Sequence, residues 1–416
     1  MIKKIIISAC LLLSLISFSQ EGTSSPYSFY GVGEAKFKGT LESRSMGGVS
    51  VSPDTIHINL QNPAGYANLK FTTFTMGATN SHTKLKTDKE DAKTQRTSFD
   101  YMALAVPLGK FGAGFGLIPY SSVGYNIESI SADGSQNNKR FNGYGGLNKV
   151  FLGVGYKIIP NLSIGVDAHY NFGKIETNSL EFVPNVPIGS RELNTANLSG
   201  VNFNFGIMFQ SKINKNTSFF SSLNYTPQST LVSENTRIIQ TVSYNANYDV
   251  APVDSFPSQI ISTDLKLPSK LSLGAGIGNT RKWMIGADVT MQNIGNLANT
   301  YNTIDNVTYE KYTKYSIGGF FIPNSKLFSS YGKRITYRGG FKYEKTGLIV
   351  NSVSINDVGF TLGLGLPIIG SLSNVNFGFE FGKKGTTSSN LIQENYANFN
   401  VSFSLNDKWF VKTKFN

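Results

Sequence analysis

The sequence predicts an all-β fold: a transmembrane antiparallel β-barrel of about 14 strands with an N-terminal lumenal hatch. Segments of alternating apolar and polar residues recur from residue 69 to the C-terminus, and helical periodicity is nowhere sustained. After residue 20 no apolar run reaches the roughly 18 residues of a membrane-spanning helix. Charged residues are 15% of the chain, below the roughly 25% usual in soluble domains, whereas Gly (42), Phe (30) and Tyr (20) are abundant.

Residues 1–20 are predicted to form a signal peptide. Lys3 and Lys4 precede an apolar run that ends at Phe18, and small and polar residues follow. This layout indicates export and, with the strands, the outer membrane of a Gram-negative cell. Cys10, the only cysteine, lies within the apolar run and has too little sequence before it to favour a lipoprotein anchor. The mature chain therefore has no cysteine for a disulfide or a thiol nucleophile.

The stretch LSIGVDAHYNFG at residues 162–173 shows the alternation most clearly. Every even position is apolar and every odd position is polar or glycine, so a strand here has one apolar and one polar face. In a soluble sandwich the apolar face would meet a core, and in a barrel it would meet lipid. Similar segments are expected at 69–81, 97–106, 111–120, 149–158, 201–210, 217–227, 269–278, 282–292, 311–322, 335–350, 356–367, 372–383 and 395–405.

The connections between these segments alternate in length, which favours the barrel. Short turns at 107–110, 159–161, 213–216 and 278–281 alternate with long polar stretches. Outer-membrane barrels have short periplasmic turns and longer external loops, so both ends of the strand region are placed in the periplasm. The long stretches, all predicted to be loops, are 82–96, 125–148, 178–197, 228–268, 293–310 and 384–394.

The segments outside the alternating region complete the domain plan. Residues 69–405 are assigned to the barrel and 406–416 to a C-terminal tail or a last short strand. Residues 21–68 do not alternate and are rich in Gly, Ser, Asn and Pro. They could be a disordered periplasmic tail, but a barrel of this size has room for a plug, so we expect a hatch inside the lumen.

Two blocks of sequence resemble the FadL family of outer-membrane transporters for long-chain fatty acids and other hydrophobic compounds. The first comprises SRSMGGVSVS (43–52) and INLQNPAGYANL (58–69), and the second is LKLPSKLSLGAGIGNTRKWMIGADVTMQNIG (265–295). The resemblance implies a fourteen-strand barrel, a hatch formed by the N-terminal segment, and lateral release of substrate through a gap in the wall. The residues that carry the hatch pattern are Met46, Gly47, Gly48, Asn62, Pro63, Ala64 and Gly65.

Uptake of small hydrophobic compounds such as fatty acids is the function that the resemblance implies. Four polar side chains, expected in the lumen from the alternation, are the candidate ligand contacts: Asp167, His169, Asp288 and Glu380. The stretches 359–368, 374–386 and 392–410 look more like a distant branch of the superfamily that serves protein secretion or surface attachment. The alternative function is therefore a barrel partner or cap subunit of an outer-membrane secretion or surface-assembly machine.

Catalysis, metals, cofactors and nucleic acids have little support in the sequence. The three histidines, His57, His82 and His169, show no metal-ligand spacing, and no G-x-S-x-G element occurs. His169 and Asp167 share a strand face, which is read as a lumen network holding the hatch rather than a catalytic pair. The net charge of +12, which falls to +10 without Lys3 and Lys4, suits anionic lipid and lipopolysaccharide headgroups as partners.

Overall fold

The structure is a computed structural model that describes residues 22–130, 134, 137–245, 249–294, 306–324, 326 and 329–409. The predicted signal peptide and residues 410–416 lie outside the described residues. None of the described helices has the length and apolar content needed to cross a bilayer. The short helices are η1 (Pro26–Phe29), α2 (Leu41–Arg44), η2 (Pro63–Asn68), α3 (Tyr331–Arg334) and η3 (Ser388–Asn390).

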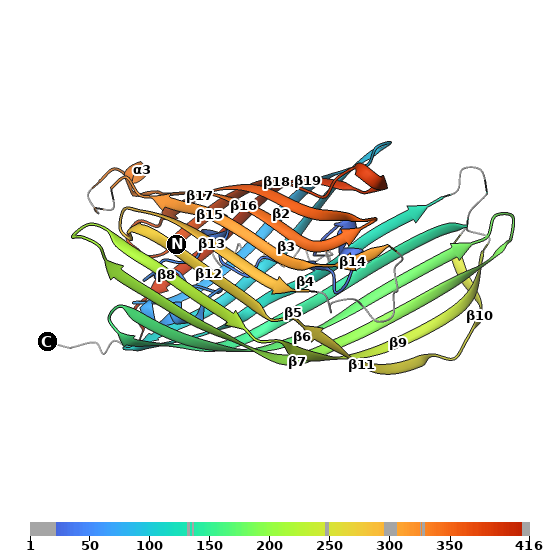
Figure 1. Cartoon of the computed structure of the whole chain (residues 1–416), viewed down its shortest axis with the longest axis horizontal. Helices are drawn as coiled ribbons and strands as arrows, with labels where there is room; N and C mark the ends of the chain where they lie inside the picture. Colours follow the sequence, from blue (N-terminus) through green and yellow to red (C-terminus); the bar gives the residue numbers. More distant parts are fainter. Residues whose placement is uncertain are drawn as a thin grey trace.

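The strands form one antiparallel sheet that closes on itself (Figure 1). They are β1 (Glu34–Ala35), β2 (Thr72–Lys86), β3 (Asp91–Leu108), β4 (Phe111–Ser129), β5 (Asn138–Ile159), β6 (Leu162–Phe182), β7 (Ile188–Lys212), β8 (Ser218–Thr226), β9 (Ser229–Tyr244), β10 (Val250–Ser255), β11 (Gln259–Leu267), β12 (Lys270–Asn279), β13 (Trp283–Asn293), β14 (Val307–Tyr309), β15 (Lys311–Phe321), β16 (Thr336–Val350), β17 (Val353–Pro367), β18 (Asn374–Lys384) and β19 (Gln393–Asp407).

The wall of this sheet is a closed 14-strand barrel, which confirms the predicted fold class. β19 pairs with β2 from Gln393↔Lys86 to Asp407↔Thr72, and this seam closes the wall. Three passes consist of more than one strand: β8 with β9, β10 with β11 and β12, and β14 with β15. Pro227 and Pro268 lie at two of these interruptions, where a residue without an N–H cannot continue the ladder.

The alternation sorts side chains between lipid and lumen as expected for a barrel. On β6, Val166 and Tyr170 are exposed on the outside, whereas Asp167 and His169, which lie between them in sequence, are buried on the inside. The C-terminal part of β7 repeats this pattern, with Phe203 and Phe205 exposed and Asn202 and Asn204 buried. The outer apolar band faces hydrocarbon, and the polar positions enclose the lumen.

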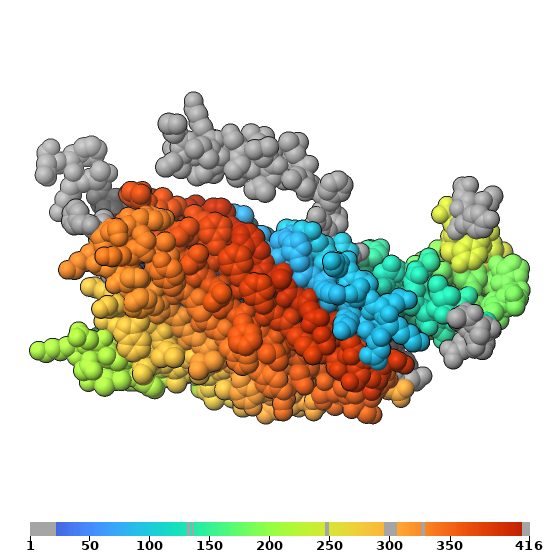
Figure 2. All heavy atoms as spheres, turned by 90° about the horizontal axis from the view of Figure 1, so that it is seen from above, coloured from blue at the N-terminus to red at the C-terminus, as the bar shows by residue number. Residues whose placement is uncertain are grey.

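Most of the segments predicted to be long loops are instead continuations of the strands, so that prediction is wrong. β2 and β3 leave only residues 87–90 between them, and β9, β10 and β11 all lie within the predicted loop at 228–268. The hydrogen-bonded ladder continues beyond the membrane, where the outer face meets water and the outward apolar alternation fades, while inner-face residues such as Leu198 and Leu231 remain buried. In Figure 2 these continuations project from one side of the barrel as the teal, green and yellow extension.

The wall has an incomplete ladder between β3 and β4. These strands pair only from Met102↔Leu117 to Leu108↔Phe111, although both continue well beyond Met102 and Leu117. The N-terminal segment takes the place of β3 along part of β4: β1 pairs with Ser121 and Ser122. The β3–β4 ladder is therefore incomplete, and the N-terminal segment pairs with part of the exposed β4 edge.

Candidate functional site

Residues 22–68, the described part of the predicted hatch, lie inside the barrel, and the Asn-Pro-Ala-Gly turn attaches the C-terminal part of this segment to the wall (Figure 1). The Asn62 side-chain amide donates to the carbonyls of Ile207 and Leu223, both at 3.1 Å, and its Oδ1 accepts from the N–H of Ala64 at 3.0 Å. This N-cap, followed by Pro63, starts the 3₁₀-helix η2. Strand glycines make room: a Cβ on Gly206 would lie 2.0 Å from Asn62 Oδ1.

The Met-Gly-Gly element ties the hatch to the opposite wall. Gly47 and Gly48 have φ of 70° and 103°, values that disfavour any residue with a Cβ. The N–H of Gly47 donates to Thr361 Oγ1 at 2.9 Å, and its carbonyl accepts from the Ser316 hydroxyl at 2.8 Å. The seven predicted hatch residues therefore lie in two turns, and each turn contacts a different set of strands.

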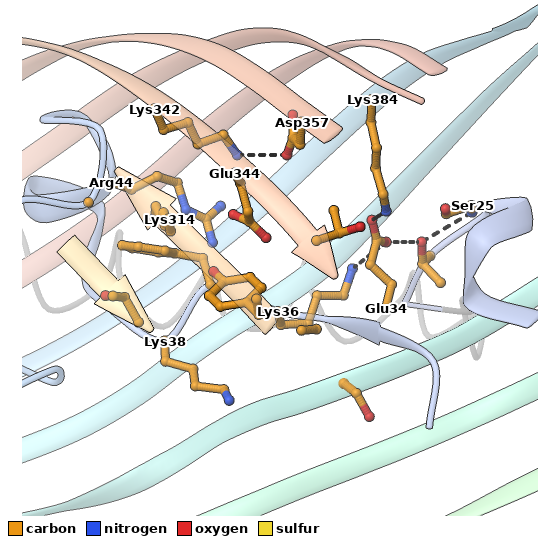
Figure 3. A pocket seen from close by; sticks show the side chains of 18 of the residues that line it. Ser25, Glu34, Lys36, Lys38, Arg44, Lys314, Lys342, Glu344, Asp357 and Lys384 are labelled. Carbon is orange, nitrogen blue, oxygen red and sulfur yellow. Dashed lines mark hydrogen bonds and ion pairs between the residues drawn. The ribbon is translucent and has the colours of Figure 1, made fainter. Parts of the chain in front are cut away.

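A cavity of about 420 Å³ with many charged side chains lies between the hatch and the wall (Figure 3). Its first ion-pair group joins hatch residues to β18 and β19. The Lys384 ammonium lies 2.8 Å from Glu34, and Lys36 lies 4.0 Å from the same carboxylate. Ser25 donates to Glu394 at 2.5 Å. A hatch rich in polar residues is thus attached to the wall by charge-assisted hydrogen bonds.

The second ion-pair group belongs to the wall itself. Lys342 on β16 lies 3.3 Å from Asp357 on β17 and 2.6 Å from Glu380 on β18. Tyr396 donates to Asp357 at 2.7 Å. Three neighbouring strands are linked across the lumen face, and all three charged side chains are mostly buried.

Arg44, at the end of α2, provides a third link between hatch and wall. Its guanidinium lies 3.2 Å from Asp100, 2.6 Å from Thr79 Oγ1 and 2.7 Å from Asn400 Oδ1. Asp100 lies on β3 two residues before Met102, where β3 is no longer paired with β4. This contact therefore holds to the hatch the part of β3 that pairs only with β2.

The far side of the cavity carries an excess of positive charge. Lys38, Lys270 and Lys314 all line it, and none of them has an acidic partner within 4.0 Å among the residues that the structure describes. The Lys38 ammonium lies 3.5 Å from the centre of the Tyr120 ring, and burial lowers the pKa of Lys38 to about 8. Such a surface suits water and polar groups better than hydrocarbon.

A histidine in the hatch forms its own acidic cluster. His57 Nδ1 lies 2.8 Å from Asp54 Oδ2, and Nε2 lies 3.7 Å from Glu42. Burial opposes protonation of the imidazole, but the two carboxylates outweigh it and raise the pKa of His57. Asn376 on β18 donates to Glu42 at 2.9 Å, which connects this cluster to the wall.

The raised pKa of His57 predicts a pH-dependent contribution to stability. A group whose folded pKa exceeds its unfolded value of 6.5 stabilises the fold fully below that value, and the contribution is lost as pH rises through the folded pKa. We expect the thermal unfolding midpoint of the purified barrel to fall as pH rises from 6.5 through the folded pKa of His57. His57→Gln should flatten the fall, and an unchanged pH profile in this variant would contradict the assignment.

The four predicted lumen residues fall into two groups. Asp288 and Glu380 line the charged cavity. Asp167 and His169 are buried elsewhere on β6, with His169 Nε2 3.7 Å from Asp167 Oδ2, and they are not among the residues that line the cavity. Asn204 donates to Asp167 at 3.3 Å. The structure thus does not bring the four residues together into one ligand site.

Sequence reasoning missed the charged residues that dominate the cavity, although a signal was available. On β16, Arg338, Lys342 and Glu344 occupy alternate positions of a strand whose other face carries Tyr337 and Phe341. Charges at a period of two opposite aromatic residues mark the lumen face of a barrel strand. Among the described residues no group of three or more His, Cys, Asp or Glu side chains is placed to hold a metal ion.

Filling of the lumen by the hatch predicts a conductance phenotype. Deletion of residues 21–60 would remove the ion pairs between hatch and wall and the Met-Gly-Gly turn, and it would leave more of the lumen to water. We expect the deletion variant to show a higher single-channel conductance in planar bilayers than the full chain. Equal conductance from a variant with normal barrel mobility on electrophoresis would contradict a lumenal plug.

A family model described as BamG matches residues 1–416, the whole chain. A comparison with functionally curated proteins gave no match. Among solved structures, the chain is similar to the TodX deltaS2S3 mutant monoaromatic hydrocarbon channel, with a TM-score of 0.62 and 17% identity over 94% of this chain and 100% of that one. It is also similar to the Ralstonia pickettii toluene transporter TbuX, with a TM-score of 0.59 and 13% identity over 89% and 99%.

A Pseudomonas aeruginosa FadL homologue has a TM-score of 0.56 and 11% identity over 90% of this chain and 99% of that one. At these identities the likeness shows the fold alone. It confirms the FadL-like outer-membrane barrel expected from the two sequence blocks.

Proposed function

This chain belongs to the BamG family, and we propose that it is a barrel subunit of the Bam outer-membrane assembly machinery, without transport of its own. This is the alternative function that the C-terminal stretches favour in the sequence. The family match is the observation that carries the proposal, because it covers the whole chain. The fold is compatible with either role, since a barrel scaffold can host unrelated functions.

The contents of the lumen support a partner role over uptake. The hatch is attached to the wall through Glu34 and Arg44, whose partners lie on β18, β19, β2 and β3, and through Asn62, whose partners lie on β7 and β8. The cavity beside it is lined by buried ion pairs and lysines together with apolar and aromatic side chains such as Phe37, Tyr120 and Leu348. An apolar ligand entering it would have to desolvate the charged groups on part of its surface. An interior occupied by the hatch and by a cavity with many charged groups fits a barrel whose outer surfaces and external extension carry the function.

The proposal is tested by purification of the affinity-tagged protein from native membranes in mild detergent. We expect recovery of the assembly machinery in stoichiometric amounts, and depletion of this protein should lower the levels of other outer-membrane barrels. Recovery of the barrel alone, together with a loss of hydrophobic-compound uptake on depletion, would overturn the proposal.

Uptake of a small hydrophobic molecule is the second candidate, and the incomplete β3–β4 ladder favours it. The break begins at Met102 and Leu117, next to the lipid-facing band, where a lateral path would meet the bilayer. In the same experiment, a lipid-like ligand that copurifies with the barrel would support this candidate. Lipopolysaccharide and phospholipid at the outer wall are proposed partners under either function.

A further inference from the structure

Among the residues that the structure describes, β11 (Gln259–Leu267) is a free sheet edge, and it lies in the external extension of the barrel. All nine residues pair with β9, from Gln259↔Arg237 to Leu267↔Ser229, and no strand among the described residues pairs with the other side of β11. Below Pro268 the same pass continues as β12, which pairs with both β8 and β13. Among the described residues, this pass therefore has two partner strands along β12 and only one along β11.

The position of this edge excludes lipid as its cover. The outward apolar residues end at Val201 on β7 and Val232 on β9, and Asn197 and Glu234 follow on the same outer face. Asp264 of β11 pairs with Val232, so residues 259–263 lie beyond the apolar band. A row of backbone N–H and C=O groups at this height can be satisfied by water or by another polypeptide.

The side chains on this edge are apolar to a degree unusual for an external strand. Ile260 is 75% exposed and Ile261 is 43% exposed, and they point to opposite faces of the sheet. Phe256 and Val253, just before β11, are 59% and 60% exposed. Natural proteins protect free edges with lysine, proline or bulges. β10 has Pro252 and a bulge, whereas β11 has no such feature until Lys266.

Charge distinguishes the edge from the rest of the protein. Residues 249–267 carry three aspartates and one lysine, whereas the whole chain has a net charge of +12. Neither Asp254 nor Asp264 forms an ion pair with any described residue. The complementary partner is an extended segment with alternating apolar residues and basic side chains.

We propose that β11 is the docking edge for a strand contributed by a protein of the assembly machinery, which would extend the external sheet by β-augmentation. This inference rests on the proposed function and names the surface through which it operates. One added strand would pair along the nine-residue edge and cover Ile260 and Ile261. The apolar residues then stabilise the contact, and Asp254 and Asp264 favour a basic partner.

Single cysteines test the proposal, because the chain contains no cysteine after Cys10. Ile260→Cys should react with a membrane-impermeant maleimide in the purified barrel and be protected in intact cells. The control Asp88→Cys, at the exposed tip between β2 and β3, should react equally in both. Equal labelling of Ile260→Cys in both states would overturn the proposal, and so would a disulfide-linked dimer of two copies, since it would place a second copy on this edge.

A double lysine variant gives a second, independent readout. Ile260→Lys combined with Asp264→Lys should lower recovery of the machinery about tenfold, with Asp88→Lys as the matched control. If wild type and variant recover the machinery equally, the docking edge is wrong while the proposed function stands. If the wild type recovers no machinery, both fall. Heat-dependent mobility on electrophoresis reports whether the variant barrel has folded.

Discussion

Lys342→Met is expected to destabilise the folded barrel by about 3 kcal/mol, the lower end of the range for breaking a buried ion pair. Methionine preserves most of the side-chain volume but leaves Asp357 and Glu380 without their shared cation. The side chains of these carboxylates are 12% and 7% exposed, so water compensates only in part through the adjoining cavity. The measurement is the denaturant midpoint of the purified barrel in detergent, followed by its electrophoretic mobility.

Lys345→Met is the matched control, because Lys345 lies three residues away on the same strand and is exposed, with no ion pair among the described residues. It should change the midpoint by less than about 0.5 kcal/mol. Loss of stability of similar size in both variants would show that the strand tolerates methionine poorly. An unchanged midpoint in Lys342→Met would mean that the carboxylates do not depend on this lysine.

Gly340→Ala is expected to destabilise the protein by about 1–3 kcal/mol, as overpacking of an interior commonly does. A Cβ on Gly340 would lie 2.2 Å from the carbonyl carbon of Met46 and 2.3 Å from the N of Gly47. Both contacts are backbone atoms of the hatch, so the Met-Gly-Gly turn would have to move away from β16. Protease sensitivity of residues 40–50 in the purified barrel measures that movement directly.

The neighbouring Gly339 provides the control within the same strand. A Cβ on Gly339 would find its nearest atoms at 4.0 Å, so Gly339→Ala should leave both stability and protease sensitivity unchanged. If Gly340→Ala also left both unchanged, the close approach of the Met46 backbone to the wall would be disproved. If both alanine variants were destabilised to the same extent, the cause would be the strand and not the hatch.

Local sequence patterns predict the membrane-spanning strands well, but they do not predict how far these strands continue beyond the membrane. The alternation at 162–173 and 201–210 identifies strands because lipid on one side and a polar lumen on the other impose a period of two. At 228–240 the outer face meets water while Leu231, Ser233 and Asn235 are buried on the inner face, so the sequence loses its apolar–polar period. β9 therefore looks like a polar loop although its backbone continues the ladder. Strand pairing between distant segments, and not side-chain pattern, forms the external part.

The cavity could be predicted only in part, because its ion pairs join residues that are far apart in sequence. Glu34 and Lys384 are 350 residues apart, and no local pattern relates them. Asp288 and Glu380 could be assigned to the lumen from alternation alone, and both line the cavity. Their partners depend on barrel closure and on the path of the hatch. Asn62 was identifiable through the family pattern, but its two carbonyl acceptors on β7 and β8 were not.

The two-residue strand β1 changes what emptying this barrel would involve. Glu34 and Ala35 pair with β4 where β3 has left it, the Lys36 N–H donates to the Tyr120 carbonyl at 3.1 Å, and the Gly124 N–H donates to Ser28 at 3.1 Å. The segment that fills the lumen is therefore also part of the wall. Withdrawal of this segment would leave backbone N–H and C=O groups on the β4 edge without partners, so any unplugging must be coupled to a rearrangement of the wall.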